Sequence, residues 1–307
     1  MEYPATENRL ADIDIKLVET KLEGGGRQYV HADLRSASPD EGRPLIIVSH
    51  GFLGYRRWGF FPWLSEKLAE AGFHVMTISF SRCGVDEATG RITRPDVFAG
   101  NTVGAEIEDL LAACGAARGA GFPLACAGRP WGLMGHSRGG AVSILAAPRV
   151  PEAASIVTWS ALAKLDRYTG RRKEEWKRTG RLPFNEGRAD TGLWLDYSYY
   201  EDIDRNREAY DLPKRASELG IPHLIVHGRH DAAVTMKEER LLVQYTPRSE
   251  RSFEIIEGCG HTFGARHPMR KPPAPLEKAA GLTVEWFRKT LAGGLNGIRS
   301  NDGGLEA

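Results

Sequence analysis

A serine inside a glycine-rich pentapeptide is the first residue of this sequence whose setting could support chemistry. Residues 135–139 read Gly-His-Ser-Arg-Gly, which fits the pattern G-x-S-x-G. An apolar run precedes them and small residues follow, so a strand is expected to turn sharply into a helix at Ser137. Such a turn exposes the hydroxyl, and the helix N-terminus adds partial positive charge where an oxyanion would form. Because small residues at 135 and 139 avoid collisions there, the pattern predicts Ser137 as a nucleophile.

The hydroxyl of a serine becomes a good nucleophile only when a neighbouring base accepts its proton. Nine histidines compete for that role, and His261 is the best placed of them. It lies in a glycine-rich loop, Gly258-Cys259-Gly260-His261, directly after the last expected strand. Open parallel sheets build their sites beyond the carboxyl ends of their strands. We therefore expect His261 to be the base that serves Ser137.

The second nitrogen of that imidazole needs an acid, which fixes the tautomer and stabilises the imidazolium. Asp231 follows a buried strand in the segment His-Gly-Arg-His-Asp, again at a carboxyl end, and Asp166 after the preceding expected strand is the alternative. The order serine, aspartate, histidine along the chain differs from the orders in the two major serine-protease classes. We expect Asp231 to orient His261. Helix capping is the simpler role for either aspartate.

Strands and helices that alternate along the chain must bring these side chains together. Residues 45–51 form a continuous apolar run, which is typical of a strand buried on both faces of a parallel sheet. Apolar residues at helical spacing follow, with Gly72 and Gly115 as expected helix ends. The expected strands cover residues 11–20, 27–36, 45–51, 74–80, 131–135, 154–160, 222–228 and 252–257, and the expected helices residues 60–71, 103–114, 138–147, 237–245 and 276–291. This alternation predicts an α/β fold with a doubly wound, mostly parallel sheet, opened by a hairpin that turns at residues 24–26.

The alternation stops between residues 164 and 217, where aromatic and charged residues are interrupted by glycine and proline. This stretch has few aliphatic residues from which to build a core, so we expect a small cap inserted into one fold. The predicted core domain then comprises residues 1–163 and 218–293. The tail, residues 294–307, is polar and rich in glycine and is expected to be disordered.

Aromatic residues of the predicted cap are candidates for substrate binding. Trp194 and Tyr197, together with Tyr199 and Tyr200, could line a pocket for an acyl or aryl group. Alternatively, the same rings dock the cap on the sheet. The sequence does not decide between these two roles.

Composition limits the partners and cofactors. The net charge is +1, so nothing indicates nucleic acid or an anionic membrane as a partner. The four cysteines show no CxxC pair and no metal-ligand spacing with histidine, which indicates reduced thiols and predicts neither metal nor cofactor. The first residues carry early charges unlike a signal peptide, and no run is apolar enough to span a bilayer. We expect a cytoplasmic protein that acts on a small molecule, as a monomer or a homo-oligomer.

Taken together, these motifs resemble those of the α/β-hydrolase superfamily over residues 11–291. The resemblance is carried by His50-Gly51-Phe52, GHSRGG, HGRHD and GCGH, and it is strongest to bacterial serine esterases near the dienelactone-hydrolase and prolyl-oligopeptidase branches. It implies an oxyanion hole made by the amide of Arg138 and that of Phe52, with Leu53 as the alternative donor. Leu53 would also contact the substrate. His50 would then have a structural role in its loop.

The sequence departs from several relatives that the resemblance brings in. Dienelactone hydrolases use a cysteine where this chain has Ser137, which speaks against cyclic dienelactones as substrates. The large propeller domain of the full prolyl oligopeptidases is missing from this sequence. Dehalogenases and epoxide hydrolases of the same fold carry an aspartate at the position of the serine, so their reactions are disfavoured.

The three residues and the resemblance predict a serine hydrolase that cleaves carboxylic esters. Ser137 would form an acyl-enzyme, and water activated by His261 would then release the acid. A serine peptidase of the acyl-aminoacyl or dipeptidyl type is one alternative. A non-catalytic protein of the same fold that binds a ligand is another, although such proteins commonly lose a member of the triad.

Overall fold

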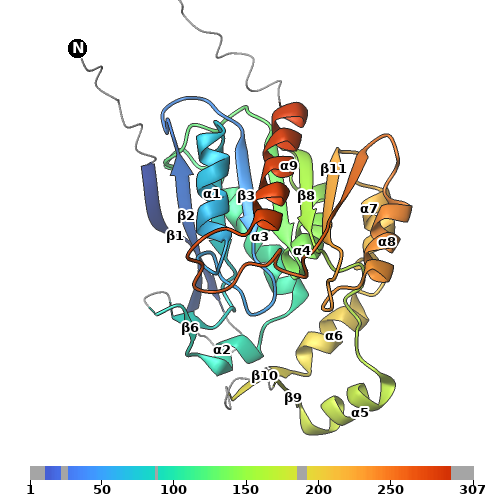
Figure 1. Ribbon diagram of the computed structural model, residues 1–307. Coiled ribbons are helices and arrows are strands. Elements are labelled where there is room, and N and C mark those ends of the chain that lie inside the picture. Colours follow the sequence, from blue (N-terminus) through green and yellow to red (C-terminus); the bar gives the residue numbers. More distant parts are fainter. Residues whose placement is uncertain (1–10, 22–26, 87–88, 185–191, 292–307) are drawn as a thin grey trace, which may run out of the picture.

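An eight-stranded, mostly parallel sheet forms the centre of the molecule (Figure 1). The structure is a computed structural model that describes residues 11–21, 27–86, 89–184 and 192–291. The strand order is β1-β2-β4-β3-β7-β8-β11-β12, antiparallel from β1 to β4 and parallel from β4 onward. The strands are β1 Ala11–Lys21, β2 Arg27–Ser36, β3 Leu45–Ser49, β4 His74–Ser79, β7 Trp131–His136, β8 Ala153–Trp159, β11 His223–Gly228 and β12 Arg251–Ile256.

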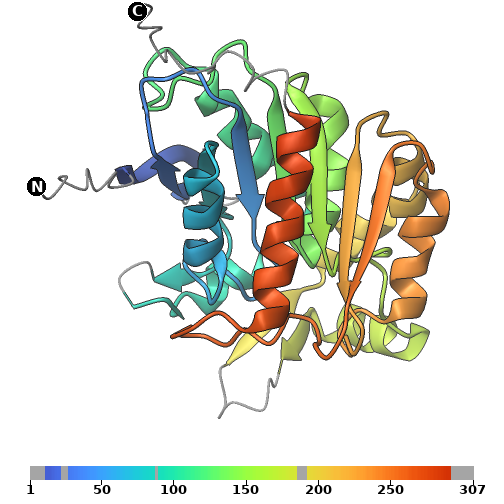
Figure 2. The same cartoon turned by 45° about the horizontal axis from the view of Figure 1, so that its top comes forward.

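Helices cover both faces of this sheet and bury a core on each. Figure 2 shows α1 and α9 lying over the same face, where Phe61 of α1 and Phe287 of α9 are buried in one cluster. On the opposite face, Leu110 of α3 and Ile144 of α4 belong to a second cluster. The helices are α1 Phe61–Glu70, α3 Val103–Ala117, α4 Arg138–Ala146, the short 3-10 helix Ala147–Arg149, α8 Met236–Tyr245 and α9 Ala274–Thr290. The prediction of a doubly wound α/β fold is therefore confirmed.

Two predicted details of the helices have different outcomes. Gly72 follows α1 with a φ of +98°, a conformation that suits glycine and ends the helix as predicted. Gly115 does not end α3, which continues to Ala117, so that prediction was wrong. A side-chain carbon at Gly115 would meet no atom within 4 Å, and its backbone stays helical. Glycine there costs some helix propensity but nothing forces the chain to turn.

The connection between β4 and α3 contains elements that the sequence did not predict. A hairpin of two-residue strands, β5 Val85–Asp86 and β6 Arg91–Ile92, is followed by the single-turn helix α2 Pro95–Ala99. Strands this short show no measurable alternation of polar and apolar residues. The predicted turn at residues 24–26 and the predicted disordered tail lie outside the described residues.

The segment between β8 and β11 folds into helices and a hairpin. Its elements are α5 Gly170–Thr179, β9 Arg181–Phe184, β10 Leu193–Asp196, α6 Ser198–Arg205 and α7 Leu212–Ser217. Of these, α5, β9, β10 and α6 lie below the carboxyl ends of the parallel strands, whereas α7 lies beside α8 (Figure 1). Trp176 is completely buried, and its indole N–H donates to the carbonyl oxygen of Leu195 at 3.0 Å. Tyr199 stacks on Trp176 with ring centroids 6.1 Å apart. Aromatic side chains therefore supply the packing that the scarce aliphatic residues do not. None of the helices within the described ranges is long and apolar enough to cross a membrane.

Candidate active site

Ser137 occupies a strained turn between β7 and α4. Its φ is +55° and its ψ −121°, values that a residue with a side chain rarely adopts. The N–H of Ser137 donates to the carbonyl oxygen of Trp159 at 2.8 Å, and its own carbonyl accepts the N–H of Gly140 at 3.0 Å. The first bond ties Ser137 to the end of β8, and the second lies in the first turn of α4. Together they hold the backbone of Ser137 in its strained conformation. The sharp strand-to-helix turn predicted from the pentapeptide is present.

Glycines on either side of Ser137 are required by close backbone contacts. A side-chain carbon on Gly135 would lie 2.2 Å from the carbonyl oxygen of Gly139. A side-chain carbon on Gly139 would lie 2.4 Å from the carbonyl oxygen of His50. Neither neighbour is a flexible side chain that could move away, so both positions exclude any larger residue. The turn is thereby packed tightly against the end of β3.

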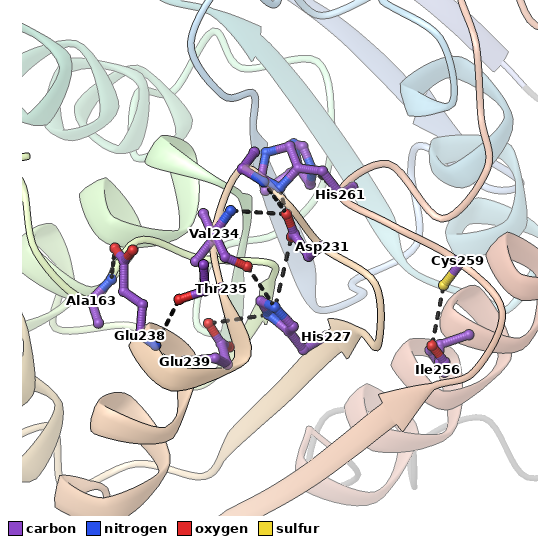
Figure 3. Close-up of polar contacts among 12 residues, drawn as sticks. Ala163, His227, Asp231, Val234, Thr235, Glu238, Glu239, Ile256, Cys259 and His261 are labelled. Atoms are coloured by element: carbon purple, nitrogen blue, oxygen red, sulfur yellow. Dashed lines mark hydrogen bonds and ion pairs between the residues drawn. The ribbon is translucent and has the colours of Figure 1, made fainter.

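His261 and Asp231 meet beyond the carboxyl ends of β12 and β11 (Figure 3). The Nδ1–H of His261 donates to Oδ2 of Asp231 at 2.8 Å. The other carboxylate oxygen accepts the N–H groups of Ala233 and Val234, both at 2.8 Å. With its proton on Nδ1, the ring of His261 keeps the lone pair of Nε2 available as a base.

The carboxyl group of Asp231 is buried yet stabilised as an anion. Burial raises its pKa, but the hydrogen bond and the charge of His261, with the N–H of Val234, outweigh burial and hold the pKa below its usual value. The alternative acid, Asp166, is exposed and pairs with the Lys173 ammonium at 2.5 Å. The structure therefore brings His261 to Asp231, and gives Asp166 a surface ion pair instead.

A cavity of about 770 Å³ opens beside these groups, and both Ser137 and His261 border it. Within the described chain, no hydrogen bond joins the hydroxyl of Ser137 to the ring of His261. Hydrogen bonds of this kind often tighten only when a substrate is bound. His136 also borders the cavity, and its Nε2–H donates to the carbonyl oxygen of His261 at 2.9 Å. Burial and the neighbouring His261 lower the pKa of His136 to about 3, so it stays neutral beside the site.

Backbone N–H groups near Ser137 lack an acceptor. Among the residues that the structure describes, the N–H groups of Phe52, Leu53 and Arg138 are not paired with any oxygen, so Leu53 is as available a donor as Phe52. The loop of Phe52 lies against the serine, because a side-chain carbon on Gly51 would be 2.9 Å from Cβ of Ser137. Leu53 has a φ of +59° and borders the cavity with Phe52. The loop is therefore placed where its amides could meet an oxyanion.

His50 anchors this loop as a neutral side chain. Its Nδ1–H donates to the carbonyl oxygen of Gly51 at 2.8 Å, and its Nε2 accepts the N–H of Phe80 at 3.1 Å. Complete burial lowers the pKa of His50 to about 4. Both ring nitrogens are thus used inside the protein, which agrees with the structural role that the resemblance implied.

The side chain of Arg138 supports the site from within and does not face the cavity. It is 4% exposed and forms an ion pair with Glu106, whose carboxylate also accepts the side-chain N–H of Asn101 at 2.8 Å. The guanidinium lies 4.5 Å from the centre of the Phe52 ring. Burial raises the pKa of Glu106 more than Arg138 lowers it. An arginine held in this way cannot also reach a substrate carboxylate.

Of the three residues that the sequence suggested for substrate binding, one lines the cavity and two do not. Leu53 borders the cavity, whereas Trp194 and Tyr197 are not among its lining residues. The indole N–H of Trp194 donates to Asp196 at 2.9 Å and Arg181 covers its ring. Tyr197 packs on Trp176, with ring centroids 6.0 Å apart.

Several residues that line the cavity were not predicted from the sequence, because they come together from separate loops. Tyr55 and Trp58 come from the loop after β3, Arg91 from the short hairpin, and His267 from the loop before α9. His267 stacks on Trp58 and lies 3.3 Å from the hydroxyl of Tyr55. Of the described residues between β8 and β11, Leu193 alone reaches the wall. It sits next to Trp194 on a strand, where adjacent side chains point to opposite faces.

The cysteines and the metal-binding residue types of the described ranges form no second candidate site. All four cysteines are buried. Burial raises the pKa of Cys114 to about 12 and that of Cys126 to about 11, so neither thiol ionises at neutral pH. Within the described ranges, no three histidine, cysteine, aspartate or glutamate side chains are grouped to hold a metal ion.

Comparisons with known proteins agree with this architecture. The model of the Alpha/beta hydrolase family matches residues 45–276. Among solved structures, the esterase domain of a Rhodothermus marinus protein is 19% identical, with a TM-score of 0.57 over 92% of this chain and 99% of its own. Est1E from Butyrivibrio proteoclasticus, solved with ferulic acid bound, is 20% identical, with a TM-score of 0.63 over 90% of this chain and 99% of its own. A dienelactone hydrolase from Anabaena variabilis is 16% identical, with a TM-score of 0.55 over 91% of this chain and 99% of its own. No curated protein matches the sequence, and at these identities the structural likeness concerns the fold.

Proposed function

The chain belongs to the alpha/beta hydrolase family, and from that premise we propose that it cleaves carboxylic esters through an acyl-enzyme on Ser137. One observation carries the proposal: a histidine oriented by a buried aspartate at 2.8 Å borders the same cavity as a serine in a strained turn. In this proposal Ser137 is the nucleophile, His261 the base and Asp231 the acid that orients the base. A serine needs a base, and the base needs an anion on its other nitrogen.

In the proposed reaction, Oγ of Ser137 attacks the ester carbon while Nε2 of His261 takes the hydroxyl proton. The N–H groups of Phe52 and Arg138 stabilise the oxyanion that forms. His261 then gives its proton to the ester oxygen of the leaving group, the C–O bond breaks, and the alcohol leaves. Water attacks the acyl-enzyme while His261 takes its proton. His261 returns that proton to Oγ of Ser137 as the bond to the serine breaks, and the acid is released. Asp231 stays ionised throughout and stabilises the imidazolium.

The cavity supports a small-molecule ester as substrate. Its volume of about 770 Å³ suits a compact ligand, and aromatic rings of Phe52, Tyr55, Trp58 and Phe61 border it. We include residues 164–217 in the proposal as a cap, because Leu193 contributes to the cavity wall. Four buried cysteine side chains support a reducing, cytoplasmic setting.

Kinetics with three kinds of ligand test this proposal. Aryl esters of short and longer acyl chains should give a burst of phenol followed by steady turnover, and Ser137→Ala should abolish both. Exposed Ser198→Ala is the matched control and should keep full activity. Faster cleavage of aminoacyl anilides than of esters would favour a peptidase. Ligand binding without a burst for any activated ester would favour a non-catalytic protein.

A further inference from the structure

A second histidine lies directly behind the Asp231 carboxylate, and the proposed reaction does not use it. His227 stands near the end of β11 with its side chain completely buried. Its Nε2 is 3.7 Å from Oδ2 of Asp231, and its Nδ1 is 3.3 Å from Oε2 of Glu239, a residue of α8 that is also completely buried. Figure 3 shows His227 between these two carboxylates. An aspartate, a histidine and a glutamate therefore continue the line that begins at His261.

The neighbours of the ring fix where its protons lie. Nε2 is 3.0 Å from the carbonyl oxygen of Val234, which only accepts, so Nε2 carries a proton. If Nδ1 were unprotonated, its lone pair would face the Glu239 carboxylate in a buried site without solvent. Two opposed acceptors are costly there, so a proton belongs between Nδ1 and Glu239.

The charges that face His227 favour the imidazolium. Glu239 approaches from α8, Asp231 from the loop after β11, and His261 lies beyond Asp231. Glu238, the neighbour of Glu239, turns away and binds Arg167 instead. Burial lowers the pKa of His227, but the two carboxylates outweigh burial and raise it. Burial also raises the pKa of Glu239, against the hydrogen bond and the charge of His227. The second carboxylate, that of Asp231, is the charge that favours the shared proton on the imidazole.

We propose that His227 and Glu239 form a buried imidazolium–carboxylate pair whose positive end faces Asp231, and that they are positioning residues for the His261–Asp231 couple. The proposal rests on the proposed function, since it concerns the basicity of the same His261. The pair acts in two ways. It holds Val234, whose N–H binds Oδ1 of Asp231. It also places positive charge nearer to the His261–Asp231 couple than negative charge.

The first test reads the pair itself and needs no substrate. In 15N-resolved NMR spectra of the wild-type protein, both ring nitrogens of His227 should carry protons from pH 5 to pH 9. The signal is assigned by its loss in His227→Gln. A single protonated nitrogen in this range, or a ring that titrates between pH 5 and pH 8, would overturn the proposal. Because this reading is independent of turnover, it stands even if the protein cleaves no ester.

The second test measures how the His227–Glu239 pair affects the base His261. It uses the pH dependence of kcat/KM for an aryl ester. In Glu239→Gln the amide can still donate to Nδ1, but His227 becomes neutral. The acidic limb of the profile should then move up by about half a pH unit, for charges separated as these are, with KM changed less than twofold. Glu238→Gln, one residue away, should leave the limb in place. An unmoved limb in Glu239→Gln, or an equal movement in Glu238→Gln, would contradict the positioning role. If the wild type showed no turnover at all, the proposed function would fail separately.

Discussion

The Cα of Gly139 packs against the carbonyl oxygen of His50, so closely that a side-chain carbon would stand 2.4 Å away. This contact joins the start of α4 to the end of β3. It places the turn of Ser137 beside the loop of Phe52, and both residues border one cavity. The geometry of the candidate site therefore depends on the absence of one side chain.

Replacing Gly139 with alanine should separate these elements. The added carbon meets backbone, which cannot rotate away, so we expect a loss of about 2 kcal/mol or more in the free energy of unfolding. Esterase activity should fall with it. Gly115→Ala is the control, because that glycine is helical and has open space around it. It should be neutral or stabilising by up to about 1 kcal/mol. Urea unfolding of both variants provides the measurement, and equal stabilities would refute the packing argument.

Asp231→Asn should lower catalytic activity by changing the tautomer of His261, while the protein still folds. The amide could present an N–H to Nδ1 of His261 and so select the wrong tautomer, and kcat should drop on the order of 10⁴-fold. Asp166→Asn should leave kcat within twofold, because Asp166 pairs only with surface groups such as Lys173. Steady-state kinetics on an aryl ester decide the matter. A larger loss in the Asp166 variant would make it the acid.

His223 should contribute to the loss of unfolding free energy at acidic pH. It is buried on β11 beside the hydroxyl of Thr158 at 2.8 Å, and burial lowers its pKa to about 3. The unfolded chain binds a proton at this residue below about pH 6.5, whereas the folded chain does not until about pH 3. Stability is therefore lost as the pH falls through this window.

Removing the titrating ring should weaken that dependence. Between pH 7 and pH 5, His223→Gln should lose about 2 kcal/mol less unfolding free energy than the wild type. Exposed His230→Gln is the control and should follow the wild type. Urea unfolding at the two pH values gives the comparison. Parallel losses in the wild type and the His223 variant would mean that this histidine is not buried and neutral.

Leu193 and Trp194 should differ sharply in their effect on substrate choice. Leu193 borders the cavity, whereas Trp194 packs under Arg181 on the other face of β10. Leu193→Trp should narrow the cavity and raise KM for bulky aryl esters at least tenfold, with acetyl esters less affected. Trp194→Ala should change kcat/KM less than threefold for both. The reverse pattern would return Trp194 to the role of substrate residue that its type suggested.

The sequence predicted the candidate site best for residues that directly follow parallel strands. Carboxyl ends of parallel strands share an edge, so residues after β7, β11 and β12 were expected together, and His261 does contact Asp231. The pentapeptide around Ser137 predicted the strained turn because only small residues fit it. These inferences needed the order of elements and the sizes of side chains, both of which the sequence contains.

The cavity wall could not be derived in the same way. Tyr55, Arg91 and His267 meet only through loop packing, and two-residue strands such as β5 and β6 have no visible period. On the four-residue strand β10, the choice between Leu193 and Trp194 depends on which face meets the core. The pairing of His227 with Glu239 likewise requires α8 to be docked on β11. Such features depend on tertiary contacts between distant segments.

Covalent labelling can identify the nucleophile of this protein without knowledge of its substrate. The protein is treated with a fluorophosphonate, and the adduct is located by peptide mass spectrometry. We expect one adduct per chain, on Ser137, with labelling slowed strongly in His261→Ala and absent in Ser137→Ala. An adduct on any other residue, or ester hydrolysis that persists in Ser137→Ala, would contradict it.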